Sequence, residues 1–114
     1  MSKPYLKHVA ILALMFTLFL SFGCTRCQEL RMREATLKED LYLLRDAISQ
    51  YTQDKSKPPT DMDALVAVGY FHRIPIDPIT GSANWRVVKT QGGISDIHSA
   101  SHQISSEGTP YDSW

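Results

Sequence analysis

A continuous apolar run near the N-terminus places the strongest constraint on how this 114-residue chain can fold. The run extends from Val9 to Leu20 with a single threonine in it, and it follows the basic residues Lys3 and Lys7. A helix that is apolar on every side cannot be surrounded by the small core of so short a chain. Basic residues followed by such a run are typical of an export signal or a membrane anchor. We therefore predict that residues 1–23 are a signal or membrane anchor and that the body lies outside the cytoplasm.

Both cysteines of the chain lie where the apolar run ends. The stretch Leu20-Ser21-Phe22-Gly23-Cys24 resembles a bacterial lipoprotein signal, in which a small residue precedes the cysteine that receives lipid and becomes the new N-terminus. On this interpretation Cys24 is the lipidation site. A disulfide between Cys24 and Cys27, a thioredoxin-type CxxC and half of a zinc site are the alternatives. The redox interpretation lacks a βαβ setting, and the zinc interpretation lacks a well-spaced second ligand pair.

A long amphipathic helix is predicted over residues 24–56. Strong helix formers fill Glu29 to Thr52 without Pro or Gly, and Glu34 and Lys38 have the spacing of an exposed i,i+4 ion pair. Large apolar residues recur at three- and four-residue steps, which indicates one buried stripe. This stripe packs on the chain's own domain, in a coiled-coil seam, or in both along different turns of the helix. The helix-packing residues are Leu37, Leu41, Leu44, Ile48 and Tyr51.

The remaining residues, 57–114, have the pattern of a small α+β head. Prolines at 58 and 59 end the long helix, and Thr60 is the expected N-cap of a short helix that ends at Gly69. Two β-prone runs, 85–89 and 94–99, flank Gln91-Gly92-Gly93 and predict a hairpin. From Ala100 onward no periodicity is present, so we expect a loop or tail, held by Ile104, Tyr111 and Trp114.

Charge and motif content argue against nucleic-acid binding and against catalysis. The chain has 12 basic and 12 acidic residues, and no run of one sign that would attract nucleic acid. Asp96 and His98 share one face of a predicted strand near two serines, Ser99 and Ser101. However, the G-x-S-x-G, H-E-x-x-H and phosphate-loop patterns are all missing from the sequence, and we expect no enzyme activity.

Taken together, these segments resemble the G-type major pseudopilins of type II secretion. The shared order is a membrane segment, a long amphipathic helix, a Pro-containing loop, a short helix ending Gly-Tyr, an Ile-Pro-Ile-Asp-Pro stretch and a hairpin. The resemblance covers roughly residues 33–114 and implies a pilin-like α+β fold. The residues that carry it are Ala35 to Tyr42, Ile48 to Tyr51, Lys57 to Pro59, Leu65 to Tyr70, Ile74 to Pro78 and Ser106 to Tyr111.

The resemblance implies a structural subunit of a short periplasmic filament that helps push folded proteins through an outer-membrane channel. Its partners would be other pseudopilins or secretion-apparatus proteins, with a homo-oligomer as one form, in the envelope of a Gram-negative-type bacterium. The N-terminus departs from the family pattern, because the apolar run lacks both the preceding prepilin-peptidase site and an internal glutamate. A free-standing envelope lipoprotein that binds a protein partner or ligand is therefore the alternative.

The resemblance also implies calcium in a C-terminal loop, because members of the family bind it there with acidic side chains and backbone carbonyls. The available carboxylates in this chain are Asp96, Glu107 and Asp112. A hard cation needs several oxygens together, so the alternative is a solvated loop without metal. No other cofactor is expected.

Overall fold

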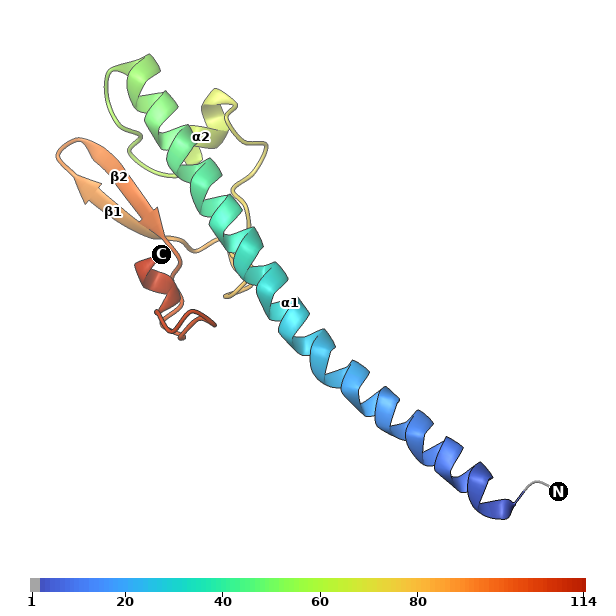
Figure 1. Ribbon diagram of the computed structural model, residues 1–114. Helices are drawn as coiled ribbons and strands as arrows, with labels where there is room; N and C mark the ends of the chain where they lie inside the picture. Colours follow the sequence, from blue (N-terminus) through green and yellow to red (C-terminus); the bar gives the residue numbers. More distant parts are fainter. Residues whose placement is uncertain (1–2) are drawn as a thin grey trace. The chain divides into compact units, whose positions relative to one another are not determined.

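The computed structural model describes residues 3–114, apart from the side chains of residues 18–24. The order of elements is α1 (Pro4–Lys55), α2 (Asp63–Val68), β1 (Arg86–Thr90), β2 (Gly93–His98) and the short 3-10 helix η1 (Tyr111–Ser113), as Figure 1 shows. The chain divides into two compact units, Met1–Met32 and Arg33–Trp114. A long helix, a short helix and a two-stranded antiparallel sheet confirm the predicted α+β class.

Helix α1 has 52 residues, so the predicted long helix is the C-terminal part of a longer element. It begins at Pro4, where a proline fits because the first helical position needs no amide donor. It ends at Lys55, where Ser56 adopts a left-handed backbone with φ of 55° and Pro58 disfavours further helix.

In the first unit, the large apolar side chains of α1 face outward. Those described from Tyr5 to Phe16 are each more than half exposed, whereas Leu30 is 39% exposed. Among the residues whose side chains are described, no helical segment is long and apolar enough to cross a membrane. The run predicted as signal or anchor extends to Leu20 and so lies partly outside these residues. The exposed set is Tyr5, Leu6, Val9, Ile11, Leu12, Leu14, Met15 and Phe16.

In the second unit, which we call the head, the leucine stripe of α1 lies in the core. Leu37, Leu41, Leu44 and Ile48 are buried, and Tyr51 is half-buried beside them. Every other element of the head except β1 contributes at least one buried residue to the same cluster, and β1 adds the half-buried Val87. The other buried members are Ala47, Leu65, Trp85, Ile94, Ile97 and Tyr111. Burial of a residue of this size stabilises a fold by about 1.5–3 kcal/mol.

Helix α2 ends as the sequence predicts, but it begins differently. Gly69 is the C-cap with φ of 95°, and its amide and that of Tyr70 donate to the last turn of the helix. The expectation of a Thr60 N-cap is wrong, because the helix begins at Asp63 and the Asp61 carboxylate accepts from Ala64 N at 2.9 Å. Thr60 and Asp61 are both suitable side-chain acceptors for a helix N-terminus, and Asp61, one residue nearer the helix, makes the bond.

The predicted hairpin is present as β1 and β2, joined by Gln91-Gly92. The strands pair antiparallel from Arg86 opposite His98 to Thr90 opposite Gly93, with a bulge between Val88 and Lys89. Gly93 lies against the loop after α1, where a Cβ atom would meet Pro59 O at 2.3 Å. The Ile94 amide donates to the same carbonyl at 2.8 Å, so this close approach fixes the hairpin to that loop.

The C-terminal segment, residues 99–114, is ordered by contacts that its sequence pattern does not reveal. Tyr111 is buried and Trp114 half-buried, but Ile104 is 63% exposed, so the expectation that Ile104 holds this segment is wrong. The segment turns back on itself, since the Ser105 amide donates to Thr109 O and the Tyr111 amide to Gln103 O. It lies against α1 in the head (Figure 1).

Candidate functional site

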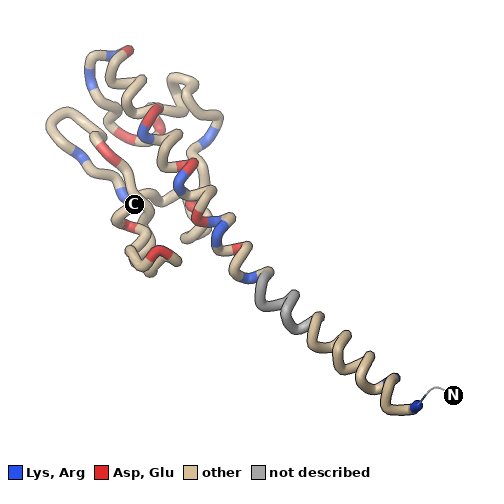
Figure 2. Tube along the Cα trace, viewed as in Figure 1, with Lys and Arg blue, Asp and Glu red and all other residues tan. Residues whose placement is uncertain are grey.

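The most elaborate polar contacts of the head lie where the C-terminal segment meets α1. Glu34, Lys38 and Arg45 of α1 follow one another at spacings of four and seven residues, which puts them along one side of the helix. Each of the three bonds to the C-terminal segment. Figure 2 shows that basic and acidic residues alternate along this part of α1.

Glu34 is the most buried of the three charged residues. Its Oε1 accepts from Ser106 N at 2.7 Å and from the Tyr111 hydroxyl at 2.8 Å, and its Oε2 accepts from the Ser106 hydroxyl. All three donors belong to the C-terminal segment, so one carboxylate fixes both Ser106 and Tyr111. Three donors satisfy the hydrogen-bonding capacity of this buried carboxylate. Without them, its burial would lower the stability of the fold.

The pKa values of this contact follow from burial and hydrogen bonding. Burial alone would raise the pKa of Glu34, but the bonds from Ser106 and Tyr111, with the nearby Lys38 charge, hold that pKa below its usual value. Burial and the bond to Glu34 raise the pKa of Tyr111 to about 12. At neutral pH the pair is therefore a carboxylate accepting from a protonated phenol.

Arg45 joins α1 to both the hairpin and the end of the chain. Its Nε donates to Asp96 Oδ1 at 2.9 Å, and its Nη2 donates to the main-chain oxygens of Ile97 and Trp114, both at 2.8 Å. His98 Nδ1 also contacts the Trp114 oxygen at 2.5 Å, and its Nε2 lies 3.3 Å from Asp96 Oδ2. Burial would raise the pKa of Asp96, but the Ile97 amide, Arg45 and His98 together lower it.

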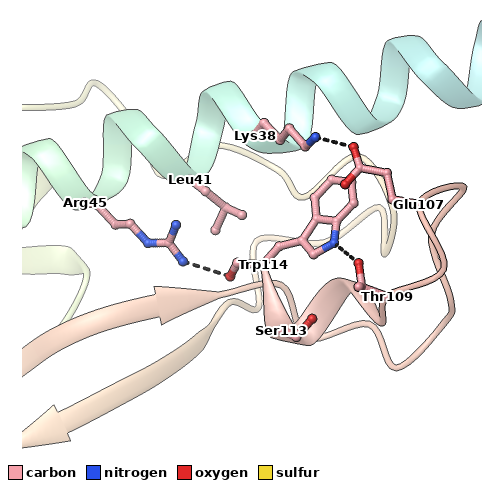
Figure 3. A pocket seen from close by; sticks show the side chains of 7 residues that line it. All are labelled: Lys38, Leu41, Arg45, Glu107, Thr109, Ser113 and Trp114. Atoms are coloured by element: carbon pink, nitrogen blue, oxygen red, sulfur yellow. Dashed lines mark hydrogen bonds and ion pairs between the residues drawn. The ribbon is translucent and has the colours of Figure 1, made fainter.

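Lys38 lines a surface hollow of about 390 Å³ beside the C-terminal segment (Figure 3). Its ammonium pairs with Glu107 at 2.5 Å and lies 4.7 Å from the centre of the Trp114 ring. The Trp114 indole donates to Thr109 Oγ1 at 2.8 Å and packs edge-on against Tyr111. The sequence predicts that Glu34 and Lys38 pair with each other. Instead, each bonds to a residue of the C-terminal segment, Glu34 to Ser106 and Lys38 to Glu107. The hollow is lined by Lys38, Leu41, Arg45, Glu107, Thr109, Ser113 and Trp114.

The three predicted calcium ligands lie in three separate polar contacts. Asp96 contacts Arg45 and His98, Glu107 contacts Lys38, and Asp112 contacts His102 at 2.7 Å. Within the part of the chain that the structure describes, no three acidic, histidine or cysteine side chains are placed to hold a metal ion.

The serines near Asp96 and His98 are not brought into a catalytic arrangement with them. The Ser99 hydroxyl donates to the buried Asp77 carboxylate at 2.5 Å and not to His98. Asp77 also accepts from the amides of Ile79 and Thr80 at 2.7 and 3.3 Å. This contact fixes the Ile-Pro-Ile-Asp-Pro stretch beneath the end of β2, which is a structural role.

The predicted lipidation site, Cys24, falls on a residue whose side chain lies outside the described part of the structure. Cys27 is described and is a free, exposed thiol.

Sequence reasoning missed Glu34 and Arg45 as the residues that order the C-terminal segment. A signal for Glu34 was present, because it lies three residues before Leu37 and seven before Leu41, on the apolar stripe. A charged residue on a buried stripe needs partners, and four potential donors, Ser105, Ser106, Thr109 and Tyr111, follow in the C-terminal segment. Nothing comparable distinguishes Arg45 from the other charged residues of α1.

Comparison of the chain with protein-family models, with curated proteins and with solved structures finds no match.

Proposed function

We propose that this chain is a pseudopilin-like structural subunit, or an accessory, of a type II secretion or other pilus-like apparatus. It is anchored in the cell envelope with its body in the periplasm, and it acts by packing its long helix against other subunits. No catalytic step is part of this function.

The observation that carries the proposal is that one helix serves both units. The same α1 that bears the apolar N-terminal run supplies Leu37, Leu41 and Leu44 to the core of the head. Exposed apolar side chains from Tyr5 to Phe16 require a cover, and on a helix that cover is lipid or other helices. In the proposed subunit the head is built on the continuation of the anchoring helix, which is the arrangement that a helix-packed assembly needs.

The head also leaves apolar residues of α1 exposed. Tyr42 is 66% and Leu43 is 42% exposed, and the charged residues Glu39 and Asp46 lie near them on the helix surface. Large aromatic and aliphatic residues among polar ones are typical of protein contact surfaces. The partners that this face fits are the helices of other pseudopilins or of a second copy of this chain.

A free-standing envelope lipoprotein is the second candidate function. The observation in its favour is Cys24, four positions after the apolar run ends. The run also contains no acid to pair with a neighbour's N-terminal amine. Such a protein would bind a protein partner or ligand through its head and would not polymerise.

Fractionation and mass spectrometry of the full chain, expressed in a Gram-negative host, test the anchor that both candidates share. We expect the chain in the membrane fraction. A retained apolar run supports the helix-packed subunit, because α1 then continues from the run into the head, whereas a mature N-terminus at diacylglyceryl-Cys24 supports the lipoprotein. A Cys24→Ser variant, which keeps the apolar run, should then remain unprocessed, and Cys27→Ser is the matched control. Recovery in the soluble periplasmic fraction would contradict membrane anchoring, and an intact Met1 or a methylated residue elsewhere would contradict lipidation.

A further inference from the structure

We propose that the C-terminal segment, residues 99–114, is held on α1 by the chain's own charged side chains and that its docking requires no calcium ion. The inference concerns the head alone and does not depend on assembly with other subunits.

Asp96, the predicted calcium ligand on the hairpin, is already fully engaged by protein groups. Both oxygens of Asp96 already face protein nitrogens: Oδ1 accepts from Arg45 Nε at 2.9 Å and from the Ile97 amide at 2.8 Å, and Oδ2 lies 3.3 Å from His98 Nε2. A carboxylate turned toward a guanidinium and an amide is poorly placed to ligate a cation, because the cation would have to displace both donors.

The other two carboxylates are matched in the same way. Glu107 pairs with Lys38 at 2.5 Å, and Asp112 pairs with His102 at 2.7 Å. Calcium takes about six to eight oxygen ligands, most strongly from carboxylates that converge on one point. The three predicted ligands bond to different partners and so do not converge on one point. The positive charges of Lys38 and Arg45 would also repel a divalent cation.

Protein side chains already supply the attachment to α1 that a bound metal ion would provide. Glu34 accepts three bonds from Ser106 and Tyr111, while Arg45 donates to the main-chain oxygen of Trp114. Lys38 adds its ion pair with Glu107 and its contact with the Trp114 ring. The segment is therefore fixed to α1 at three points along one side of the helix, near residues 34, 38 and 45.

The test is the response of the full chain, in detergent, to calcium. Thermal unfolding and amide hydrogen exchange of residues 99–114 are measured in EDTA and in excess CaCl2. A native-state metal site filled to 100 times its Kd would raise Tm by roughly 10 °C or more in a domain of this size. We expect calcium to shift Tm by no more than about 1 °C. We also expect the amide exchange rates of residues 99–114 to be the same with and without calcium. A clear rise in Tm or in protection with calcium would overturn the proposal.

Terbium luminescence provides a second measurement that needs no variant, because the aromatic rings of Tyr111 and Trp114 lie in the segment and would sensitise a bound ion. We expect no saturable emission. Saturable emission that calcium abolishes would overturn the proposal.

A variant tests the role of the side chains directly. Lys38→Met removes the pair with Glu107, and we expect exchange of residues 105–109 to quicken by roughly two- to five-fold, with or without calcium. Arg33→Met is the control, since it removes an exposed charge from the same helix in the head. The proposed attachment would be contradicted if Lys38→Met and the unchanged chain exchanged at equal rates. It would also be contradicted if calcium slowed exchange in the variant.

Discussion

Replacing Leu44 with aspartate is expected to unfold the head. Leu44 is fully buried at 0% exposure in the cluster formed by α1, α2, β2 and η1. An unpaired carboxylate there has no donor and costs several kcal/mol, of the order of the ~5 kcal/mol that stabilises a small domain. Circular dichroism and thermal melting of Leu44→Asp should show the cooperative transition of the head lost.

Leu43→Asp is the matched control for this prediction. Leu43 is the neighbouring residue of the same helix, but it is 42% exposed, so the same change there should cost less than about 1 kcal/mol. Equal melting of Leu44→Asp and the unchanged chain would show that the leucine stripe is not the core of the head.

Glu34→Ala should produce the second largest loss of stability. The change leaves the Ser106 amide, the Ser106 hydroxyl and the Tyr111 hydroxyl without their acceptor, and the last of these is buried. We expect a loss of about 1–3 kcal/mol, measured by chemical denaturation, because the buried Tyr111 hydroxyl loses its acceptor without regaining water. Glu39→Ala, at an exposed position of the same helix, should change stability by less than about 0.5 kcal/mol.

The pH dependence of stability follows from the same contact. Because the folded state lowers the pKa of Glu34, this carboxylate stabilises the head above the pKa of the unfolded side chain. That stabilisation is lost as the pH falls through the lower, folded pKa. Asp96 acts with the same sign. Unfolding of Glu34→Gln should therefore depend less steeply on pH in the acid range, and an unchanged slope would contradict the assignment.

The elements that sequence could predict are those set by local pattern. The leucines of α1 repeat every three or four residues, Gly69 terminates α2 through a backbone that only glycine adopts easily, and Gln91-Gly92-Gly93 separates two β-prone runs. Each of these signals lies within a few residues of the feature it predicts.

The attachment of the C-terminal segment could not be predicted in this way. Its bonds join residues 69 to 77 positions apart in the sequence, such as Arg45 with Trp114 and Glu34 with Tyr111. No sequence periodicity indicates such pairs, because residues so far apart in the sequence come together only when the whole head folds. The local pattern instead favoured Glu34 with Lys38, which are neighbours on the helix surface.

Photo-crosslinking in cells tests most directly whether α1 packs against other subunits. A benzophenone amino acid replaces Tyr42, an exposed aromatic of α1, and Ile104, which is equally exposed on the C-terminal segment, is the comparison position. The proposal predicts that irradiation at position 42 gives adducts with a second copy or with another pilus-like subunit, at higher yield than at position 104. Only monomer at position 42, in a chain shown to be folded and membrane-bound, would contradict it.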